Sequence, residues 1–146
     1  MKHTNLIDFF TQDHRSCDQA WIAVENAADS SDATAIAECY GKFQADMLHH
    51  FQMEEEVLFP AFEQATGMTQ GPTVVMRMEH EQMRGLLVQM AGAAASGDGD
   101  ELTDLGDTLM MVIQQHNAKE EGMLYPMADQ HIPEDWASLQ ARLEAI

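Results

Sequence analysis

Two pairs of histidine and glutamate, each spaced four residues apart, stand out in this sequence. His50 is followed by Glu54, and His116 is followed by Glu120. Residues at positions i and i+4 share one face of a helix, so each pair would present an imidazole beside a carboxylate. Imidazole nitrogens and carboxylate oxygens are common ligands of divalent metals. The two pairs therefore predict metal coordination.

The pairs belong to an internal repeat. Residues 50–60 and 116–126 both fit the pattern H-x-x-x-E-E-x-x-L-[FY]-P, and the offset between them is 66 (116 − 50). The same offset relates His14 to His80 (80 − 14). The predicted ligands are His14, His50 and Glu54 from one half, and His80, His116 and Glu120 from the other. Each glutamate could instead bridge two ions, and the spacing fits both modes.

Two metal ions are expected, because the donors come from two related halves. Carboxylates and imidazoles buried without partners would destabilise the fold, and divalent cations would compensate them. A mixed nitrogen and oxygen donor set suits iron, with manganese and zinc as alternatives. These donors cannot complete two octahedral shells, so oxo or hydroxo bridges, bridging carboxylates and exogenous ligands would complete them. Open positions predict the binding of a small diatomic ligand or peroxide.

Four long helices are needed to position these residues. Helix-breaking residues cluster at 29–32, 67–72 and 96–100 and divide the chain into four segments. In each segment apolar residues recur with the spacing of one helical face, and the histidines fall within these stripes. Helices of about 25 residues are about 37 Å long, and short turns make neighbours antiparallel.

The fold class predicted from these segments is all-α, in a single domain over residues 1–146. The expected architecture is an up-down-up-down antiparallel four-helix bundle built from two internally repeated helix pairs. A short C-terminal helix is expected to begin at Pro133, with Trp136, Leu139 and Leu143 along one face. Pro60 and Pro126 are expected to kink or redirect the helices that contain them.

The duplicated H-x-x-x-E motif, together with His14 and His80, resembles the hemerythrin-like or HHE cation-binding family from His14 to Pro126. This resemblance implies a non-haem di-iron centre with carboxylate and oxo bridges. It also implies reversible O₂ binding, O₂ or redox sensing, or reaction with nitric oxide or peroxide. Oxygen-carrying members have a fifth histidine one turn before the third-helix ligand, where this chain has Met76. The set of four histidines and two glutamates is more similar to the bacterial branch that includes iron-centre repair proteins.

Three classes of function are consistent with these residues. The favoured one is binding or sensing of O₂, nitric oxide or peroxide at an open iron site. The second is an enzyme of peroxide or nitric oxide detoxification or of iron-centre repair, and the third is a cation store or structural bundle. The sequence specifies neither the physiological ligand nor a redox partner.

Composition excludes other classes of protein. Lys and Arg total 7 against 25 Asp and Glu, a net charge of −18, so nucleic acid and anionic membranes would be repelled. No apolar run approaches the length of a membrane span. Two cysteines and a charged N-terminal segment favour a reduced, cytoplasmic setting. A ferritin-type E-x-x-H motif is disfavoured, since the glutamate positions hold Thr11, Met47, Arg77 and Ile113.

The remaining polar and sulfur-containing residues have more ordinary interpretations. His3 and His131 are expected to be solvated, and His49 to lie at the surface or next to the ligands without binding the ion. Cys17 is expected to be a buried thiol, although it could approach the cluster. Tyr125 is interpreted as a packing aromatic, with a hydrogen bond near the cluster as the alternative. Glu55, Glu56 and Glu121 are expected to be solvated or to orient histidine rings. Core packing is the first interpretation of four methionines one turn from the ligands, which could also line an apolar pocket: Met47, Met76, Met83 and Met123.

Overall fold

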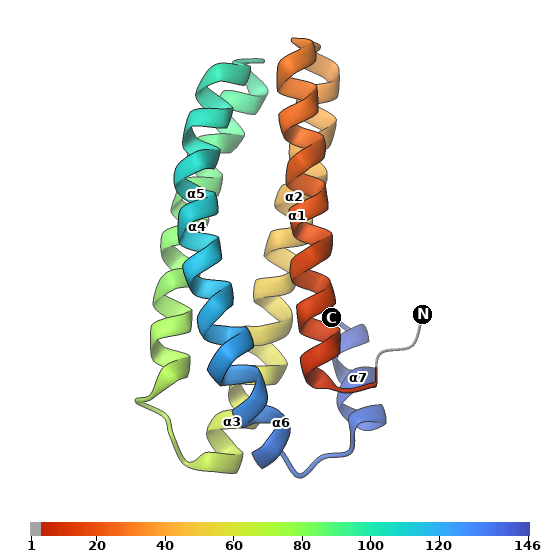
Figure 1. Ribbon diagram of the computed structural model, residues 1–146, viewed down its shortest axis with the longest axis vertical. Coiled ribbons are helices and arrows are strands. Elements are labelled where there is room, and N and C mark those ends of the chain that lie inside the picture. Colours follow the sequence, from red (N-terminus) through yellow and green to blue (C-terminus); the bar gives the residue numbers. More distant parts are fainter. Residues whose placement is uncertain (1–3) are drawn as a thin grey trace.

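The computed structural model describes residues 4–146, so His3 lies outside the described residues. Four long helices run side by side: α1 (Leu6–Ser30), α2 (Ala33–Met53), α4 (Pro72–Ala95) and α5 (Gly99–Lys119). Helices α1 and α4 each pack against both α2 and α5 (Figure 1). No strand occurs among the described residues. The predicted all-α, up-down-up-down bundle is confirmed.

Side-chain caps fix where three of these helices begin. Asn5 accepts the backbone N–H of Asp8, Asp32 accepts those of Thr34 and Ala35, and Asp98 accepts that of Glu101. Each cap satisfies N–H groups that have no partner within the helix, and its negative charge or dipole suits the helix N-terminus. The turn before α5 passes through Gly97 at φ 71°, a backbone conformation that glycine adopts without strain.

Two short π-helical turns interrupt the second helix of each pair. They are η1 (Glu54–Leu58) and η2 (Glu120–Leu124), and each begins at a predicted glutamate ligand. The N–H of Phe59 bonds the carbonyl of Glu54, five residues earlier. A proline follows at position 60, and its ring would clash with a carbonyl four residues back in a regular α-helix. The wider turn accommodates this proline, and the same pattern recurs before Pro126.

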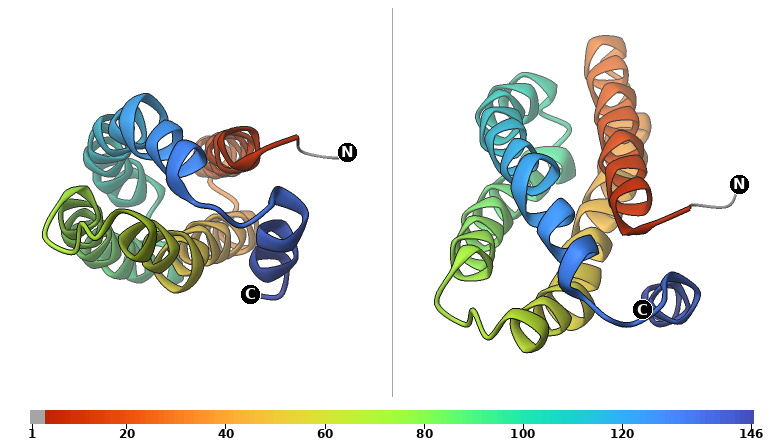
Figure 2. Two further views of the ribbon diagram at one scale, coloured as in Figure 1. Left: turned by 90° about the horizontal axis from the view of Figure 1, so that it is seen from below. Right: turned by 60° about the horizontal axis from the view of Figure 1, so that its bottom comes forward.

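Beyond the π turns the chain changes direction, as the two prolines predicted. Helices α3 (Phe59–Thr66) and α6 (Tyr125–His131) lie across the lower end of the bundle (Figure 2). Helix α7 (Trp136–Glu144) follows and buries Leu139 and Leu143. The prediction that this helix begins at Pro133 was wrong, because Asp135 is its N-cap and accepts the N–H of Ser138. The helix therefore begins three residues later.

Apolar side chains form two clusters in the core of the bundle. The upper cluster includes Trp21, Phe43 and Leu87, and the lower cluster includes Phe10 and Phe59. All six predicted ligands are buried at the level between these clusters. The bundle therefore holds one polar layer between two apolar ones.

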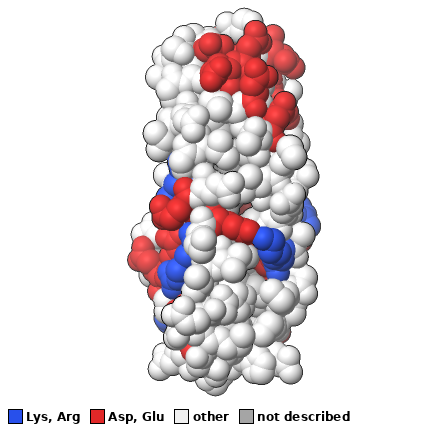
Figure 3. All heavy atoms as spheres, turned by 90° about the vertical axis from the view of Figure 1, so that its left-hand side faces the viewer, with Lys and Arg blue, Asp and Glu red and all other residues white. Residues whose placement is uncertain are grey.

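Acidic side chains form a patch at one end of the bundle. On the face formed by α4 and α5 they gather near the turn that leads into α5 (Figure 3), where Asp100, Glu101, Asp104 and Asp107 are exposed. Basic side chains on this face lie at mid-height, mixed with acidic ones. Among the described residues, no helix is long and apolar enough to cross a membrane.

Candidate metal centre

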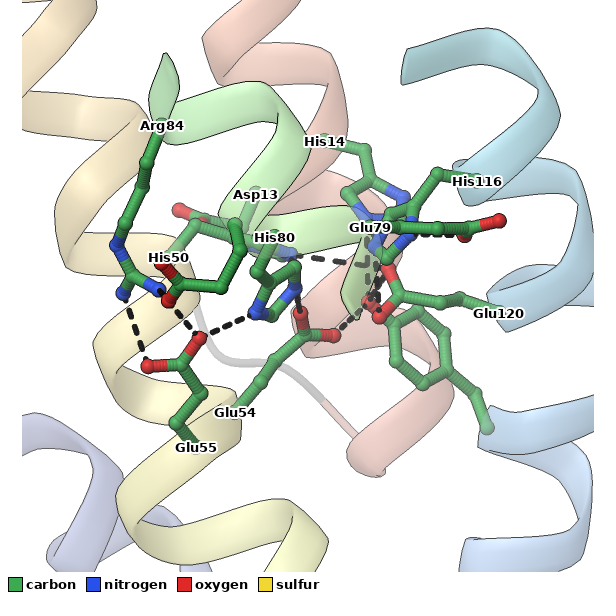
Figure 4. Close-up of polar contacts among 12 residues, drawn as sticks. Asp13, His14, His50, Glu54, Glu55, Glu79, His80, Arg84, His116 and Glu120 are labelled. Atoms are coloured by element: carbon green, nitrogen blue, oxygen red, sulfur yellow. Dashed lines mark hydrogen bonds and ion pairs between the residues drawn. The ribbon is translucent and has the colours of Figure 1, made fainter. Parts of the chain in front are cut away.

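The structure brings all six predicted ligands together in the centre of the bundle. Their side chains point toward one another from four helices and two π turns (Figure 4), and none is more than 3% exposed. They form two groups whose ligand atoms lie within 4.8 Å of one another: His14, His50, Glu54 and Glu120, and Glu54, His80, His116 and Glu120. Each group contains the two histidines of one half of the repeat, as predicted, whereas both glutamates belong to both groups.

Each glutamate faces histidines of both halves. Across the bundle, His14 Nε2 lies 3.0 Å from Glu120 Oε1, and His80 Nε2 lies 3.0 Å from Glu54 Oε1. Within one helix, His50 Nε2 lies 3.4 Å from Glu54 Oε1. On the other, His116 Nε2 lies 3.2 Å from Glu120 Oε2. Both glutamates thus lie within reach of the histidines of both halves.

A second carboxylate binds the outer nitrogen of every clustered histidine. A carboxylate can only accept, so each Nδ1 donates its proton, and each Nε2 faces the centre, where it offers a lone pair once its own proton is lost. The Nδ1 to oxygen distances are 2.6 Å for His14–Glu121, His50–Asp13 and His80–Glu55, and 2.7 Å for His116–Glu79. These partners follow the same repeat, since Glu79 is 66 residues after Asp13 and Glu121 is 66 after Glu55.

Only part of this outer carboxylate layer was expected from the sequence. For Glu55 and Glu121, the structure supports the interpretation that they orient histidine rings, whereas Glu56 is exposed. Sequence reasoning missed Asp13 and Glu79. The available signal was that each directly precedes a predicted ligand and that both share the offset of the repeat.

Basic side chains lie behind three of these carboxylates. Arg84 donates to both oxygens of Glu55, at 2.8 and 2.9 Å. Arg15 contacts Glu121, and Lys119 pairs with Glu79. Burial would raise the pKa of Glu55, but hydrogen bonds from His80 and Arg84 outweigh it and lower this pKa to about 2. Glu55 is therefore ionised at neutral pH.

His50 and His116 hold protons tightly when no cation is present. Burial opposes a charge on His50 and His116, but the neighbouring glutamates outweigh it. As a result the pKa of His50 lies well above its usual value, and that of His116 is about 9. Burial would likewise raise the pKa of Glu120, yet contacts from Glu54 and the histidines hold it well below the usual value. Glu120 is thus an ionised carboxylate beside positively charged imidazoles.

Three buried atoms of this layer have close neighbours but no hydrogen bond of acceptable geometry among the described residues: His50 Nε2, His116 Nε2 and Glu120 Oε2. Buried polar atoms are nearly always paired, so unpaired ones require an explanation. These are the atom types that divalent metals bind, and they lie in the two groups described above. The residues present therefore fit a metal centre.

Comparison with known proteins agrees with this geometry. Residues 5–128 match the hemerythrin HHE cation-binding domain family. The chain belongs to this family. A protein named DNA nickase from Nostoc sp. (strain PCC 7120 / SAG 25.82 / UTEX 2576) is 28% identical over 138 residues. The match covers 92% of this HHE domain but 37% of the nickase, so the chain spans little more than a third of that relative. No solved structure matches.

Tyr125 adds a hydroxyl group to the HHE centre. It donates to Glu54 Oε2 at 2.7 Å and lies 2.9 Å from Glu120 Oε1 and 3.1 Å from His14 Nε2. The first interpretation of this residue, a packing aromatic, was therefore incomplete, and the alternative hydrogen bond is present. Burial and the two carboxylates raise the pKa of the Tyr125 phenol well above its usual value. The hydroxyl therefore keeps its proton at neutral pH.

A small cavity adjoins the histidines of the centre. Its walls include His14, His50 and His116 together with apolar side chains such as Phe43 and Ile113. Its volume of about 10 Å³ is near the least that holds one water molecule. The cavity therefore has room for about one water-sized group.

The sulfur-containing side chains near the centre divide into two groups. Met47, Met83 and Cys17 line the cavity and are buried, and burial raises the pKa of the Cys17 thiol to about 12. Met76 is buried in the lower apolar cluster. Met123 was predicted to lie on the interior stripe of its helix, and this was wrong, since it is 47% exposed. The wider π turn rotates it outward.

Two further histidines lie away from the centre, as expected. His49 is exposed, and its Nε2 lies 3.2 Å from the carbonyl oxygen of Ile146. His131 is exposed at the end of α6. Neither belongs to a cluster that could hold an ion.

Proposed function

We propose that this HHE domain holds two iron ions between its repeated halves and uses them to bind or sense O₂, nitric oxide or peroxide. The observation that carries the proposal is the pair of four-residue groups that share Glu54 and Glu120, with unpaired Nε2 atoms on His50 and His116. Two histidines and shared carboxylates leave coordination positions open on each ion. Manganese and zinc are the alternative metals.

The protein residues would divide the work of this centre. His14 and His50 would hold one ion, His80 and His116 the other, and the two glutamates would bridge them. When bound, iron would supply a Lewis acid that can change oxidation state. The outer carboxylates fix each histidine ring with Nε2 inward, and the narrow cavity restricts access to ligands of a few atoms.

Sensing or reaction is favoured over O₂ carriage because Met76 stands where the resemblance to oxygen carriers calls for a histidine. Met76 is 2% exposed and packs in the lower apolar cluster, one turn before His80. One iron would lack a protein nitrogen and remain open to solvent or ligand. The second candidate is an enzyme of peroxide or nitric oxide detoxification or of iron-centre repair. It would use the same open coordination position to convert its substrate repeatedly. A cation store is the least favoured function.

DNA cleavage is not proposed, despite the name of the cyanobacterial relative. A net charge of −18 would repel the phosphate backbone of DNA. The similarity also covers 37% of that relative, which leaves most of its length without a counterpart here.

Metal analysis tests the proposal directly. Protein prepared with iron should contain close to two iron atoms per chain, and Glu54→Ala and Glu120→Ala should each lose much of that iron. His49→Ala is the matched control, because its exposed side chain belongs to neither group. A wild-type protein with about one iron atom per chain, or with zinc and no iron, would contradict the two-iron centre.

Optical spectra of the reduced protein distinguish reversible O₂ carriage from a chemical reaction with O₂ or nitric oxide. Anaerobically reduced protein should change its spectrum on addition of nitric oxide and should oxidise in air within minutes to hours. Reversible O₂ uptake, with the reduced spectrum restored under vacuum, would instead support an oxygen carrier. Repeated turnover of peroxide or nitric oxide with an added reductant would support the enzyme.

A further inference from the structure

The two halves of the centre differ in a hydroxyl group on one aromatic ring, besides other differences of the repeat such as Phe51 against Asn117. Phe59 and Tyr125 occupy equivalent positions of the repeat (125 − 59 = 66), and each follows a π turn. Both rings are fully buried. Phe59 lies 5.6 Å from the ring of His80, and Tyr125 lies 5.6 Å from the ring of His14, at interplanar angles of 26° and 33°. The two rings are therefore placed alike, whereas Tyr125 alone carries a hydroxyl group.

The hydroxyl of Tyr125 has a partner that the other half lacks. It donates to Glu54 Oε2 at 2.7 Å. The oxygen that corresponds to it by the repeat belongs to Glu120, and Glu120 Oε2 has no hydrogen-bond partner among the described residues. Phe59, on that side, has no donor to offer.

The two glutamates differ in the same way. Glu54 faces both of its histidines through one oxygen, since Oε1 lies 3.4 Å from His50 Nε2 and 3.0 Å from His80 Nε2. Glu120 uses two oxygens, with Oε1 3.0 Å from His14 Nε2 and Oε2 3.2 Å from His116 Nε2. A phenol carries one proton, and its shorter contact is to Glu54. The hydrogen bond thus holds the second oxygen of Glu54 away from the histidines.

We infer that Tyr125 is a positioning residue that makes the two metal positions inequivalent. It keeps Glu54 in a one-oxygen arrangement and leaves Glu120 free to use both oxygens. The inference rests on the proposed two-iron centre and adds a difference between its two ions. A small ligand at this centre then meets a hydroxyl group beside His14 and a phenyl ring beside His80, so the two positions are not interchangeable for it.

Mössbauer spectroscopy of the ⁵⁷Fe-loaded, oxidised protein tests this inference. Wild-type protein should show two quadrupole doublets of equal area, one for each environment. Tyr125→Phe should retain two irons, because the six histidine and glutamate ligands are unchanged, and its two doublets should move closer together. Loss of a merely packing hydroxyl would leave both doublets unchanged, and that result would overturn the inference.

The matched variants exchange the hydroxyl between the halves. Phe59→Tyr places a second hydroxyl on the side of Glu120 Oε2 and should also bring the two doublets closer together. The double variant F59Y/Y125F should restore the separation of the two doublets, with the hydroxyl moved to the other half. If Tyr125→Phe alone fails to load iron, the double variant decides, and a single doublet there would overturn the inference. A wild-type protein with two irons and a single doublet would also overturn the inference about Tyr125. A wild-type protein that does not bind two irons would instead contradict the proposed function.

Discussion

Each histidine of the centre has an outer carboxylate on Nδ1, and three of these carboxylates have a Lys or Arg partner. Such carboxylates fix the orientation of a ligating ring and increase its basicity. Glu55 is a clear case, since it lies 2.6 Å from His80 Nδ1 and also binds Arg84. The affinity for metal should therefore depend on residues that never touch the ion.

Glu55→Gln is expected to weaken metal binding about 10- to 100-fold, the usual effect of losing such a partner. The neutral amide no longer stabilises the polarised ring of His80. Glu56→Gln is the matched control, because Glu56 is the adjacent residue and is exposed. Competition with a chelator of known affinity measures both variants. Equal affinities would show that the contact of Glu55 with His80 does not affect the metal.

Met76→His is expected to slow the air oxidation of the reduced protein. A histidine one turn before His80 restores the donor that the oxygen carriers have, and it leaves one position fewer for direct attack. Met78→His is the control, because Met78 lies on the same helix and is 67% exposed. The rate follows from the optical change after mixing with aerated buffer. Unchanged rates in Met76→His would remove the argument against oxygen carriage.

The sequence predicted the ligands better than their surroundings. The four histidines and two glutamates followed from i, i+4 spacing and a fixed offset, which depend on the chain alone. Asp13 and Glu79 were missed because their function depends on which ring lies opposite on another helix. Contacts between helices are set by packing, and periodicity does not record them.

At the scale of helices, the π turn η2 explains why Met123 was wrongly placed in the interior and why the hydrogen bonds of Tyr125 were not the first interpretation. A regular helix would place Met123 on the same face as Glu120, whereas η2 places Tyr125 there, five residues later. Pro126 was the available signal, since a proline inside a helix requires a local change in hydrogen bonding. A kink was predicted from it, but the extra residue in the turn was not. Such turns are common at functional sites.

Gly106→Ala is expected to destabilise the fold by about 1–3 kcal/mol through overpacking. A Cβ atom at this position would lie 2.1 Å from the Trp21 ring, which itself packs on Phe43. Gly85→Ala is the control, since a Cβ there meets nothing within 4 Å, and it should stabilise the protein by up to about 1 kcal/mol. Denaturant unfolding measures both changes. A neutral Gly106→Ala would mean that Trp21 can move aside at little cost.

For the molecule as a whole, the architecture followed from the sequence because helix length, turn position and apolar stripes all agreed. The buried polar layer connects the two helix pairs of the bundle. It lies between two apolar clusters and joins α1 and α2 to α4 and α5 through cross-bundle contacts such as His14 to Glu120 and His80 to Glu54. Metal bound there would tie the halves together, so its removal should lower the melting temperature.

The stability of the metal-free protein should be greatest in mildly acidic solution. The pKa of His116 rises from 6.5 to about 9 in the fold, so its contribution is complete below pH 6.5 and is lost as pH rises through about 9. The pKa of Glu55 falls from 4.5 to about 2, so its contribution is present above pH 4.5 and is lost as pH falls through about 2. The melting temperature in chelator should therefore decline on either side of this range.

The stabilisation of the protein by bound metal should increase as pH rises from neutral to alkaline values. The ion must displace the proton of His116 to reach Nε2, so its binding strengthens as pH rises toward about 9. The difference in melting temperature between zinc-loaded and chelator-treated protein should grow between pH 6.5 and 9, a range set by the two pKa values of His116. His49→Ala should give the same profile as wild type, since His49 is exposed and outside both ligand groups. A difference that stays constant over this range would show that the clustered histidines do not exchange their protons for the metal.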